Sequence, residues 1–166
     1  MRVLDGGWDA WSSERRPTSP DATHFPAAAF EARRDARWIV STKEVRQGLD
    51  RTDRVLLDLR GDEEWTRTES GDGATAGHIP GARHVVWTDF VDATTRRLKS
   101  PTEIRARLRA AAVDPDREIV TYCQGGIRAA HALHALHAAG LTGVRNYEGS
   151  WAAWVKHGQP VEGSAA

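Results

Sequence analysis

The chain has 166 residues, and its 23 Lys and Arg residues balance its 23 Asp and Glu residues. This length suits one domain plus a short extra segment, and the balanced charge excludes a general attraction to nucleic acid or to an anionic membrane. A composition of 40% hydrophobic and 28% charged residues is that of a folded globule and not of a disordered chain. No run of residues has the length and apolarity of a membrane span, and residues 1–11 do not have the pattern of a secretion signal. We therefore expect a cytoplasmic protein.

An internal repeat links the two ends of the chain. Residues 2–17 (RVLDGGWDAWSSERRP) align without a gap with residues 145–160 (RNYEGSWAAWVKHGQP). The identical pairs are Arg2/Arg145, Gly6/Gly149, Trp8/Trp151, Ala10/Ala153, Trp11/Trp154 and Pro17/Pro160. Each copy is predicted to end a strand (residues 3–4 and 146–147), to turn through glycine and to open a short helix with both Trp on one face.

The repeat also predicts a domain organisation. The second copy closes a domain, so we expect residues 1–17 to be the remnant of a preceding homologous domain. Residues 18–36 carry two prolines and no clean periodicity, which favours an interdomain linker. The remaining domain is expected to span residues 37–162.

Strands and helices alternate along this domain. We predict strands at 38–40, 55–59, 84–86 and 118–122, and helices from Ser41 or Thr42 to about Leu49, from Ser100 onward, and from Arg128 to Ala139. Ser100 and Glu103 form a capping box with Pro101 at the first helical position. The alternation implies an α/β fold, with a parallel sheet covered by helices on both faces.

Cys123 lies where a predicted strand passes through a glycine-bearing loop into a helix, at the carboxyl end of the strand. The adjacent Gly125 and Gly126 allow the loop to curl so that its backbone N–H groups converge on the sulfur. A helix N-terminus and Arg128 add positive potential, which favours a thiolate or a bound anion. The alternative is a small buried hydrophobic residue at a strand end. Because it is the single cysteine, an internal disulfide and a cysteine-built zinc site are excluded.

Several separate motifs resemble those of rhodanese-like sulfurtransferases. The similar segments are the loop from Cys123 to Ala129, the strand motif 58–60, the turn GHIPGA at 77–82 and the closing segment 148–154. Residues 6–11 resemble the same ending of a preceding rhodanese domain. The resemblance implies a rhodanese-like fold, an open, mostly parallel five-stranded sheet, and the plan of tandem thiosulfate and 3-mercaptopyruvate sulfurtransferases, in which the second domain holds the cysteine.

The resemblance implies a double displacement through a persulfide on Cys123. The expected substrate-binding residues are Gln124, Gly125, Gly126, Ile127, Arg128, Asp58 and Arg60. It requires no metal or organic cofactor, and its partners would be small sulfur donors and acceptors, with a small thiol protein as a further acceptor. One alternative is a persulfide carrier or binding module without turnover, left by loss of the first domain. A phosphatase on the same fold is disfavoured because its loop is Cys-x5-Arg, whereas this one is Cys-x4-Arg.

Two positions depart from the tandem enzymes. Gly125 and Glu64 occupy places where those enzymes carry cations that hold the donor, so a bound anion would depend on Arg128, Arg60, Arg67 or loop amides. Asp58 could orient the loop or act as a capping carboxylate. Arg60 could bind substrate or form a structural ion pair.

Other polar residues carry less chemistry. His131, His134 and His137 drift around one helix, so we expect partly exposed histidines and no shared metal ion. His78 is expected to fix its turn. The acidic run 62–64 is expected to be a solvated helix start.

Overall fold

The computed structural model describes residues 3–33, 35–67 and 75–163, so Arg2 of the repeat lies outside the described residues. Five strands form one sheet in the order β1-β5-β4-β2-β3, and every neighbouring pair is parallel. The strands are β1 (Ile39–Val40), β2 (Arg54–Asp58), β3 (Arg83–His84), β4 (Glu118–Tyr122) and β5 (Val144–Tyr147). The predicted α/β fold is confirmed.

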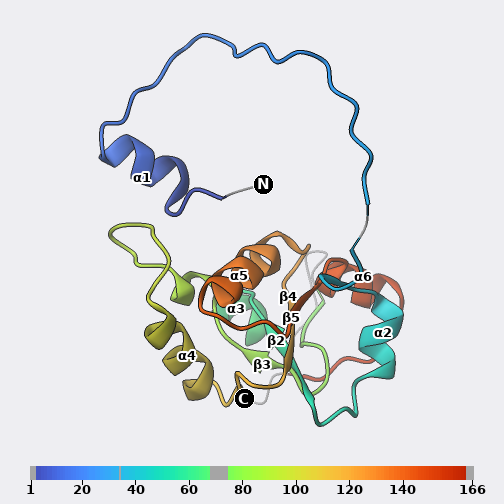
Figure 1. Ribbon diagram of the computed structural model, residues 1–166. Helices are drawn as coiled ribbons and strands as arrows, with labels where there is room; N and C mark the ends of the chain where they lie inside the picture. Colours follow the sequence, from blue (N-terminus) through green and yellow to red (C-terminus); the bar gives the residue numbers. More distant parts are fainter. Residues whose placement is uncertain (1–2, 34, 68–74, 164–166) are drawn as a thin grey trace.

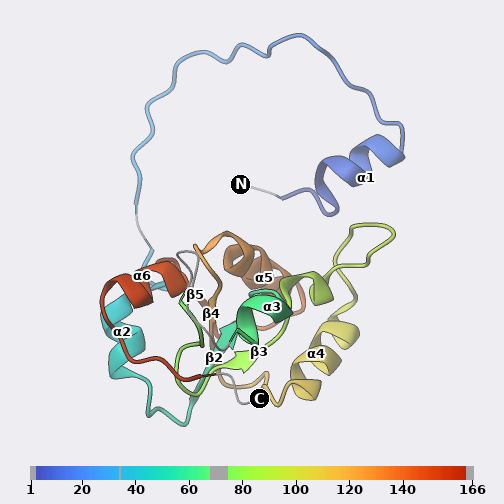
Figure 2. The same ribbon diagram turned by 180° about the vertical axis from the view of Figure 1, so that it is seen from behind.

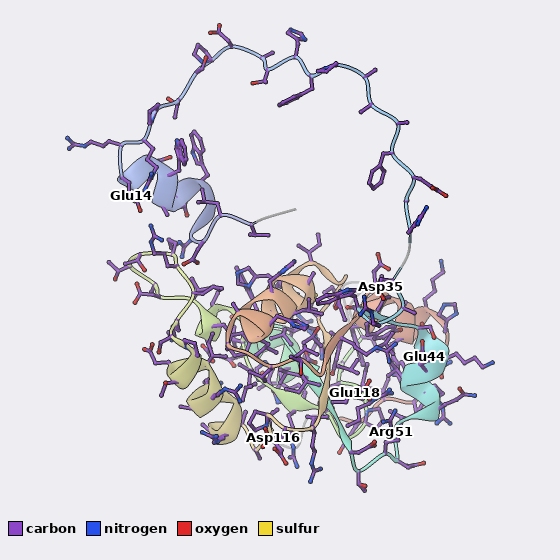
Figure 3. All side chains as sticks on the ribbon, in the orientation of Figure 1. Glu14, Asp35, Glu44, Arg51, Asp116 and Glu118 are labelled. Atoms are coloured by element: carbon purple, nitrogen blue, oxygen red, sulfur yellow. The ribbon has the colours of Figure 1, made fainter. Side chains whose placement is uncertain are left out.

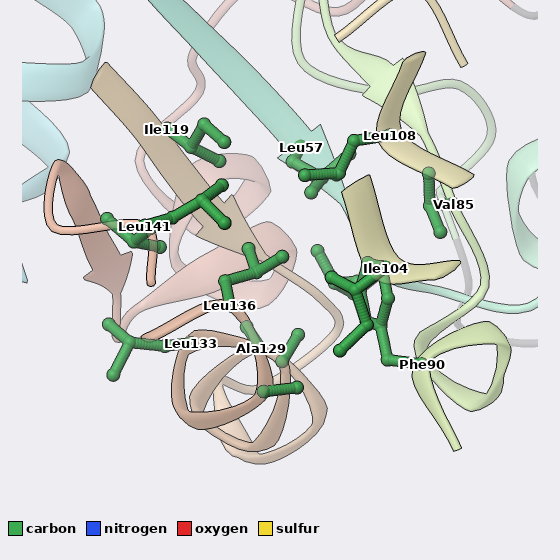
Figure 4. Close-up of a cluster of buried hydrophobic side chains, with 14 of the residues drawn as sticks. Leu57, Val85, Phe90, Ile104, Leu108, Ile119, Ala129, Leu133, Leu136 and Leu141 are labelled. Carbon is green, nitrogen blue, oxygen red and sulfur yellow. The ribbon is translucent and has the colours of Figure 1, made fainter. Parts of the chain in front are cut away.

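Helices cover both faces of this sheet (Figures 1 and 2). The helices are α1 (Gly7–Ser13), α2 (Thr42–Gln47), α3 (Asp62–Trp65), α4 (Pro101–Ala110), α5 (Ile127–Ala138) and α6 (Ser150–Lys156), with a 3-10 helix η1 (Trp87–Phe90). One core lies between the sheet and α4 with α5, and a second lies between the sheet and α2 with α6. Figure 4 shows the first core, where Leu57 and Ile119 of the sheet face Leu136 of α5.

The strand residues alternate between the two cores. Leu56 and Val120 belong to the core beneath α2 and α6, whereas Leu57 and Ile119 belong to the core beneath α4 and α5. Successive side chains of a strand point to opposite faces, and a sheet covered on both sides therefore needs continuous apolar runs. This requirement explains why the buried strands could be recognised as apolar segments.

The predicted elements agree with the structure within one residue at most ends. The range 118–122 is β4, while β2 and α5 each begin one residue earlier than predicted. The capping box at Ser100 forms, with the Glu103 N–H donating to Ser100 Oγ at 3.3 Å. The predicted strand 84–86 is shorter, because the chain enters η1 soon after the Val85 N–H bonds to Asp58 O at 3.0 Å.

The two copies of the repeat share their backbone geometry. Helices α1 and α6 cover equivalent residues of the two aligned copies. Their first residues, Gly7 and Ser150, have positive φ values of +55° and +52°. The Trp11 indole N–H donates to Pro17 O at 3.0 Å, and the Trp154 indole N–H donates to Pro160 O at 2.7 Å. The repeat is therefore present in the structure as well as in the sequence.

The surroundings of the two copies differ. Trp151 and Trp154 are buried in the core beside α2, whereas the equivalent Trp8 is 68% exposed. The predicted strand end at residues 3–4 is wrong: these residues lie in no strand and their side chains are exposed. A strand needs neighbours for its hydrogen bonds, and among the described residues only the second copy has them, through β1 and β4.

Helix α1 and the residues on either side of it contact the body of the protein through polar groups. Asp5 accepts a hydrogen bond from the Leu98 N–H at 2.8 Å, Arg96 pairs with Asp9 at 3.4 Å, and Arg97 pairs with Glu14. Between α1 and β1 the described chain forms an extended arch (Figure 1), and its side chains stand clear of the sheet (Figure 3).

Candidate active site

Cys123 follows β4 directly and is held at the entrance of α5. Its side chain is buried, and the Gly126 N–H donates to Sγ at 3.1 Å. The N-terminus of α5 therefore points its positive end toward the sulfur. The predicted loop thus brings one N–H donor to the sulfur at the N-terminus of α5, and the stabilised thiolate stays a prediction.

The two glycines of the loop differ in whether the position could hold a side chain. Gly126 has a φ of +93°, and a Cβ there would lie 2.5 Å from Glu148 O. Gly125 has open space around the position of a Cβ. Only Gly126 thus needs the absence of a side chain to form the loop.

Helix α6 braces the loop from the other side. Ser150 Oγ accepts a hydrogen bond from the Cys123 N–H at 3.1 Å and donates to Tyr147 O at 2.9 Å. The Trp151 N–H donates to Cys123 O at 2.9 Å, and the Ala152 N–H donates to Gln124 O at 3.0 Å. Sequence reasoning missed this role of Ser150. The available signal was its place in the repeat, where the equivalent residue is Gly7, because a positive φ is expected of glycine.

Glu64 forms an ion pair with the guanidinium group of Arg128. The two side chains form a bidentate pair with N···O distances of 2.6 and 2.8 Å, between α3 and the first turn of α5. The hydrogen bonds that Arg128 donates lower the pKa of Glu64. The same bonds to the Glu64 carboxylate, with a smaller effect of the Cys123 sulfur, raise the pKa of Arg128. The expectation of a merely solvated acidic helix start is wrong for Glu64, because α3 turns this carboxylate toward the loop.

Asp58 and Arg60 form a buried ion pair beside the site. Arg60 Nη2 lies 2.7 Å from Asp58 Oδ2 and 2.9 Å from Gly77 O, and Arg60 is 1% exposed. The guanidinium group also stacks over Trp151, with its Cζ atom 4.7 Å from the ring centroid. Burial and the Asp58 carboxylate raise the pKa of Tyr122. This geometry corresponds to the ion-pair alternative for Arg60, and its contact with substrate stays a prediction.

The remaining predicted residues have diverse environments. Gln124, Gly125 and Ile127 are exposed at the mouth of the loop, and Arg67 is exposed on the surface. His78 pairs with Glu162 through the backbone and its ring stacks on Trp65 at a centroid distance of 3.9 Å, in line with a turn-fixing role.

The helix histidines show no metal geometry. His131 lies edge-on to Trp87, His137 contacts Trp38, and His134 is exposed. Within 3–33, 35–67 and 75–163, no group of three or more His, Cys, Asp or Glu residues could hold a metal ion. In the same ranges, no helix has the length and apolar character needed to cross a membrane.

Comparison with known proteins identifies the family of the chain. Residues 41–157 match the rhodanese-like domain. The chain belongs to the rhodanese-like domain family. This rhodanese-like chain is 32% identical over 163 residues to the 3-mercaptopyruvate sulfurtransferase of Mus musculus, covering 96% of this chain and 54% of the relative. It is 35% identical over 161 residues to the thiosulfate sulfurtransferase of Azotobacter vinelandii, covering 96% and 58%.

The rhodanese-like chain spans about half the length of the curated relatives that it matches. A solved structure supports the fold independently. The anaerobic ergothioneine biosynthesis enzyme from Chlorobium limicola, in complex with trimethyl histidine, aligns with a TM-score of 0.85 at 24% identity over 99% of this chain and 42% of that chain. At this identity, the likeness concerns the fold.

Proposed function

We propose that this chain is a sulfurtransferase that moves a sulfane sulfur from a donor such as thiosulfate or 3-mercaptopyruvate to a thiophilic acceptor. The observation that carries the proposal is the 3.1 Å hydrogen bond from the Gly126 N–H to Cys123 Sγ, at the N-terminus of α5. Relatives at about 30% identity that are named sulfurtransferases support it.

The first displacement loads Cys123. With thiosulfate, the thiolate attacks the outer sulfur, the S–S bond breaks, and sulfite departs with the electron pair. With 3-mercaptopyruvate, the C–S bond breaks and the carbon keeps the electron pair, which gives pyruvate after protonation from solvent. Each route leaves one additional sulfur atom bonded to Cys123.

The second displacement returns the enzyme to its starting state. Cyanide, a thiol or a small thiol protein attacks the outer sulfur, and the electron pair of the S–S bond returns to the Cys123 thiolate. The loop N–H groups would hold the outer sulfur while it carries negative charge. The exposed Gln124, Gly125 and Ile127 form the side from which donor and acceptor approach.

Asp58 and Arg60 would act by positioning the loop. Their ion pair is buried, and Arg60 stacks on Trp151, whose backbone N–H bonds to Cys123 O. Breaking a buried pair by removing one partner leaves an uncompensated charge, so both residues would support the geometry of the site more than the donor itself.

We also propose the predicted division of the chain into a rhodanese-like domain (37–162), a linker (18–36) and a segment (1–17) that belongs to a second unit of the same kind. The equivalent bounds of α1 and α6 and their matching indole hydrogen bonds support it. The exposure of Trp8 supports it further, because the same position in α6 is buried.

The function is tested by thiocyanate formation from thiosulfate or 3-mercaptopyruvate and cyanide, with the Cys123→Ser variant as the matched control. We expect turnover with at least one donor in the unaltered chain and none above background in the variant. Equal rates would contradict the proposal. Loading of Cys123 without turnover would favour a persulfide carrier over an enzyme.

A further inference from the structure

The cationic groups in and beside the site already have anionic partners. Arg128, whose pKa responds to the Cys123 sulfur, is paired with Glu64, and Arg60 is paired with Asp58. Arg67 is exposed at the surface. A donor anion that approaches the α5 N-terminus therefore meets Arg128 and Arg60 with their charges already balanced by Glu64 and Asp58.

Three hydrogen bonds fix the Glu64 carboxylate in its pair with Arg128. It accepts hydrogen bonds from both terminal nitrogens of Arg128 and from the Gly61 N–H at 2.9 Å. The side chains of Glu64 and Arg128 are 32% and 29% exposed, so the pair is partly shielded from water. A bidentate pair between planar groups has a defined geometry and is stronger than a single contact. The carboxylate is thus a fixed negative charge beside a guanidinium group in the first turn of α5, two residues after the glycine whose N–H bonds Cys123 Sγ.

We propose that Glu64 determines donor specificity by disfavouring doubly charged donors and selecting donors with at most one negative charge. The inference rests on the proposed sulfurtransferase function. A thiosulfate dianion would bring two negative charges toward the Glu64 carboxylate, or would have to separate Glu64 from Arg128 before binding. A singly charged donor such as 3-mercaptopyruvate, or a neutral organic persulfide, meets a weaker repulsion.

An organic persulfide satisfies the chemistry without a second anionic group. The Cys123 thiolate attacks the terminal sulfur of R–S–SH, the S–S bond of the donor breaks, and R–S⁻ leaves with the electron pair. The terminal sulfur and its proton stay on Cys123 as a persulfide. The charge before and after the step is the same, and no oxidant or reductant is needed.

The test compares two donors in Glu64→Gln. Glutamine keeps an oxygen that can accept from Gly61 and Arg128 but removes the negative charge. We expect kcat/KM for thiosulfate divided by kcat/KM for 3-mercaptopyruvate to rise about tenfold or more, mainly through a lower KM for thiosulfate. The matched control is Glu63→Gln, an exposed carboxylate on the same short helix, which should leave the ratio near that of the unaltered chain.

Glu64→Asp keeps the charge and should keep the preference for 3-mercaptopyruvate, which separates charge from local packing. An unchanged ratio in a folded Glu64→Gln, or an equal rise in Glu63→Gln, would overturn the inference and leave the sulfurtransferase function standing. If the unaltered chain turned over neither donor and could not be loaded at Cys123, the proposed function itself would fail.

Discussion

At the scale of single residues, local sequence patterns predicted some contacts of the candidate site and missed others. The strand, the glycine pair and Arg128 predicted a loop that curls around Cys123, and the Gly126 N–H lies 3.1 Å from the sulfur. The sequence could not predict that Glu64 pairs with Arg128, because these residues lie far apart along the chain and meet only after α3 packs beside α5. Local patterns predict local loops, whereas partners across the fold need the tertiary structure.

The two loop glycines provide a residue-scale prediction. Gly126→Ala should lower the free energy of unfolding by at least about 1–3 kcal/mol, because the left-handed backbone is strained for alanine, and its Cβ would meet Glu148 O at 2.5 Å. The rate of thiocyanate formation should also be lower in Gly126→Ala. Gly125→Ala has open space and should change the free energy of unfolding by less than about 1 kcal/mol. Urea denaturation of both variants provides the measurement, and equal losses would contradict the assigned role of Gly126.

At the scale of elements, the same helical unit occurs twice with different surroundings. Both copies form a helix of the same length whose first residue has a positive φ, and each closes with an indole hydrogen bond to a proline carbonyl. The repeat in the sequence therefore predicted the local structure of α1 correctly. It could not predict the strand before α1, since a strand forms through its neighbours and not through its own residues.

This difference predicts unequal costs for equivalent substitutions. Trp151→Ala should lower the free energy of unfolding by about 3–5 kcal/mol, because it removes a buried aromatic side chain. Trp8→Ala, at the equivalent position of α1, should change it by less than about 0.5 kcal/mol, because Trp8 is 68% exposed. Chemical denaturation of both variants checks this pair. A large loss for Trp8→Ala would mean that α1 packs into this domain.

At the scale of the whole molecule, ion pairs near the amino ends of the central strands link distant elements. Arg145 of β5 pairs with Glu118 of β4 at 3.3 Å and with Glu44 of α2 at 3.2 Å (Figure 3 labels both carboxylates). Hydrogen bonds from Ser41 and Arg145 lower the pKa of Glu44 to about 2. Burial opposes the effect at Glu118, but hydrogen bonds from Arg54 and Arg145 still lower its pKa.

These carboxylates predict an acid-sensitive fold. Both are more acidic in the folded state than in the unfolded state, so their contribution is complete above the ordinary value of 4.5 and is lost as the pH falls below it, toward about 2 for Glu44. The free energy of unfolding should therefore decrease below about pH 4.5 and decrease less steeply in Glu118→Gln. Glu31→Gln, on the exposed linker, is the control. Urea midpoints that rise as the pH falls over this range would contradict the assignment.

The sequence predicted the parallel sheet, its two cores and the position of the thiol, because continuous apolar strands and a glycine-bearing turn are local features. It could not determine how the charges around the thiol are shared, which depends on the packing of α3, α5 and α6 against one another. The geometry of the loop and the proposed electrostatics of donor binding thus come from different levels of the structure.

The most direct test of the proposed function is the intact mass of the protein after incubation with 3-mercaptopyruvate and removal of excess donor. We expect one added sulfur atom per chain, absent from Cys123→Ser and removed by cyanide with release of thiocyanate. An unchanged mass with every donor, or an equal gain in Cys123→Ser, would contradict the claim that this thiol carries sulfur.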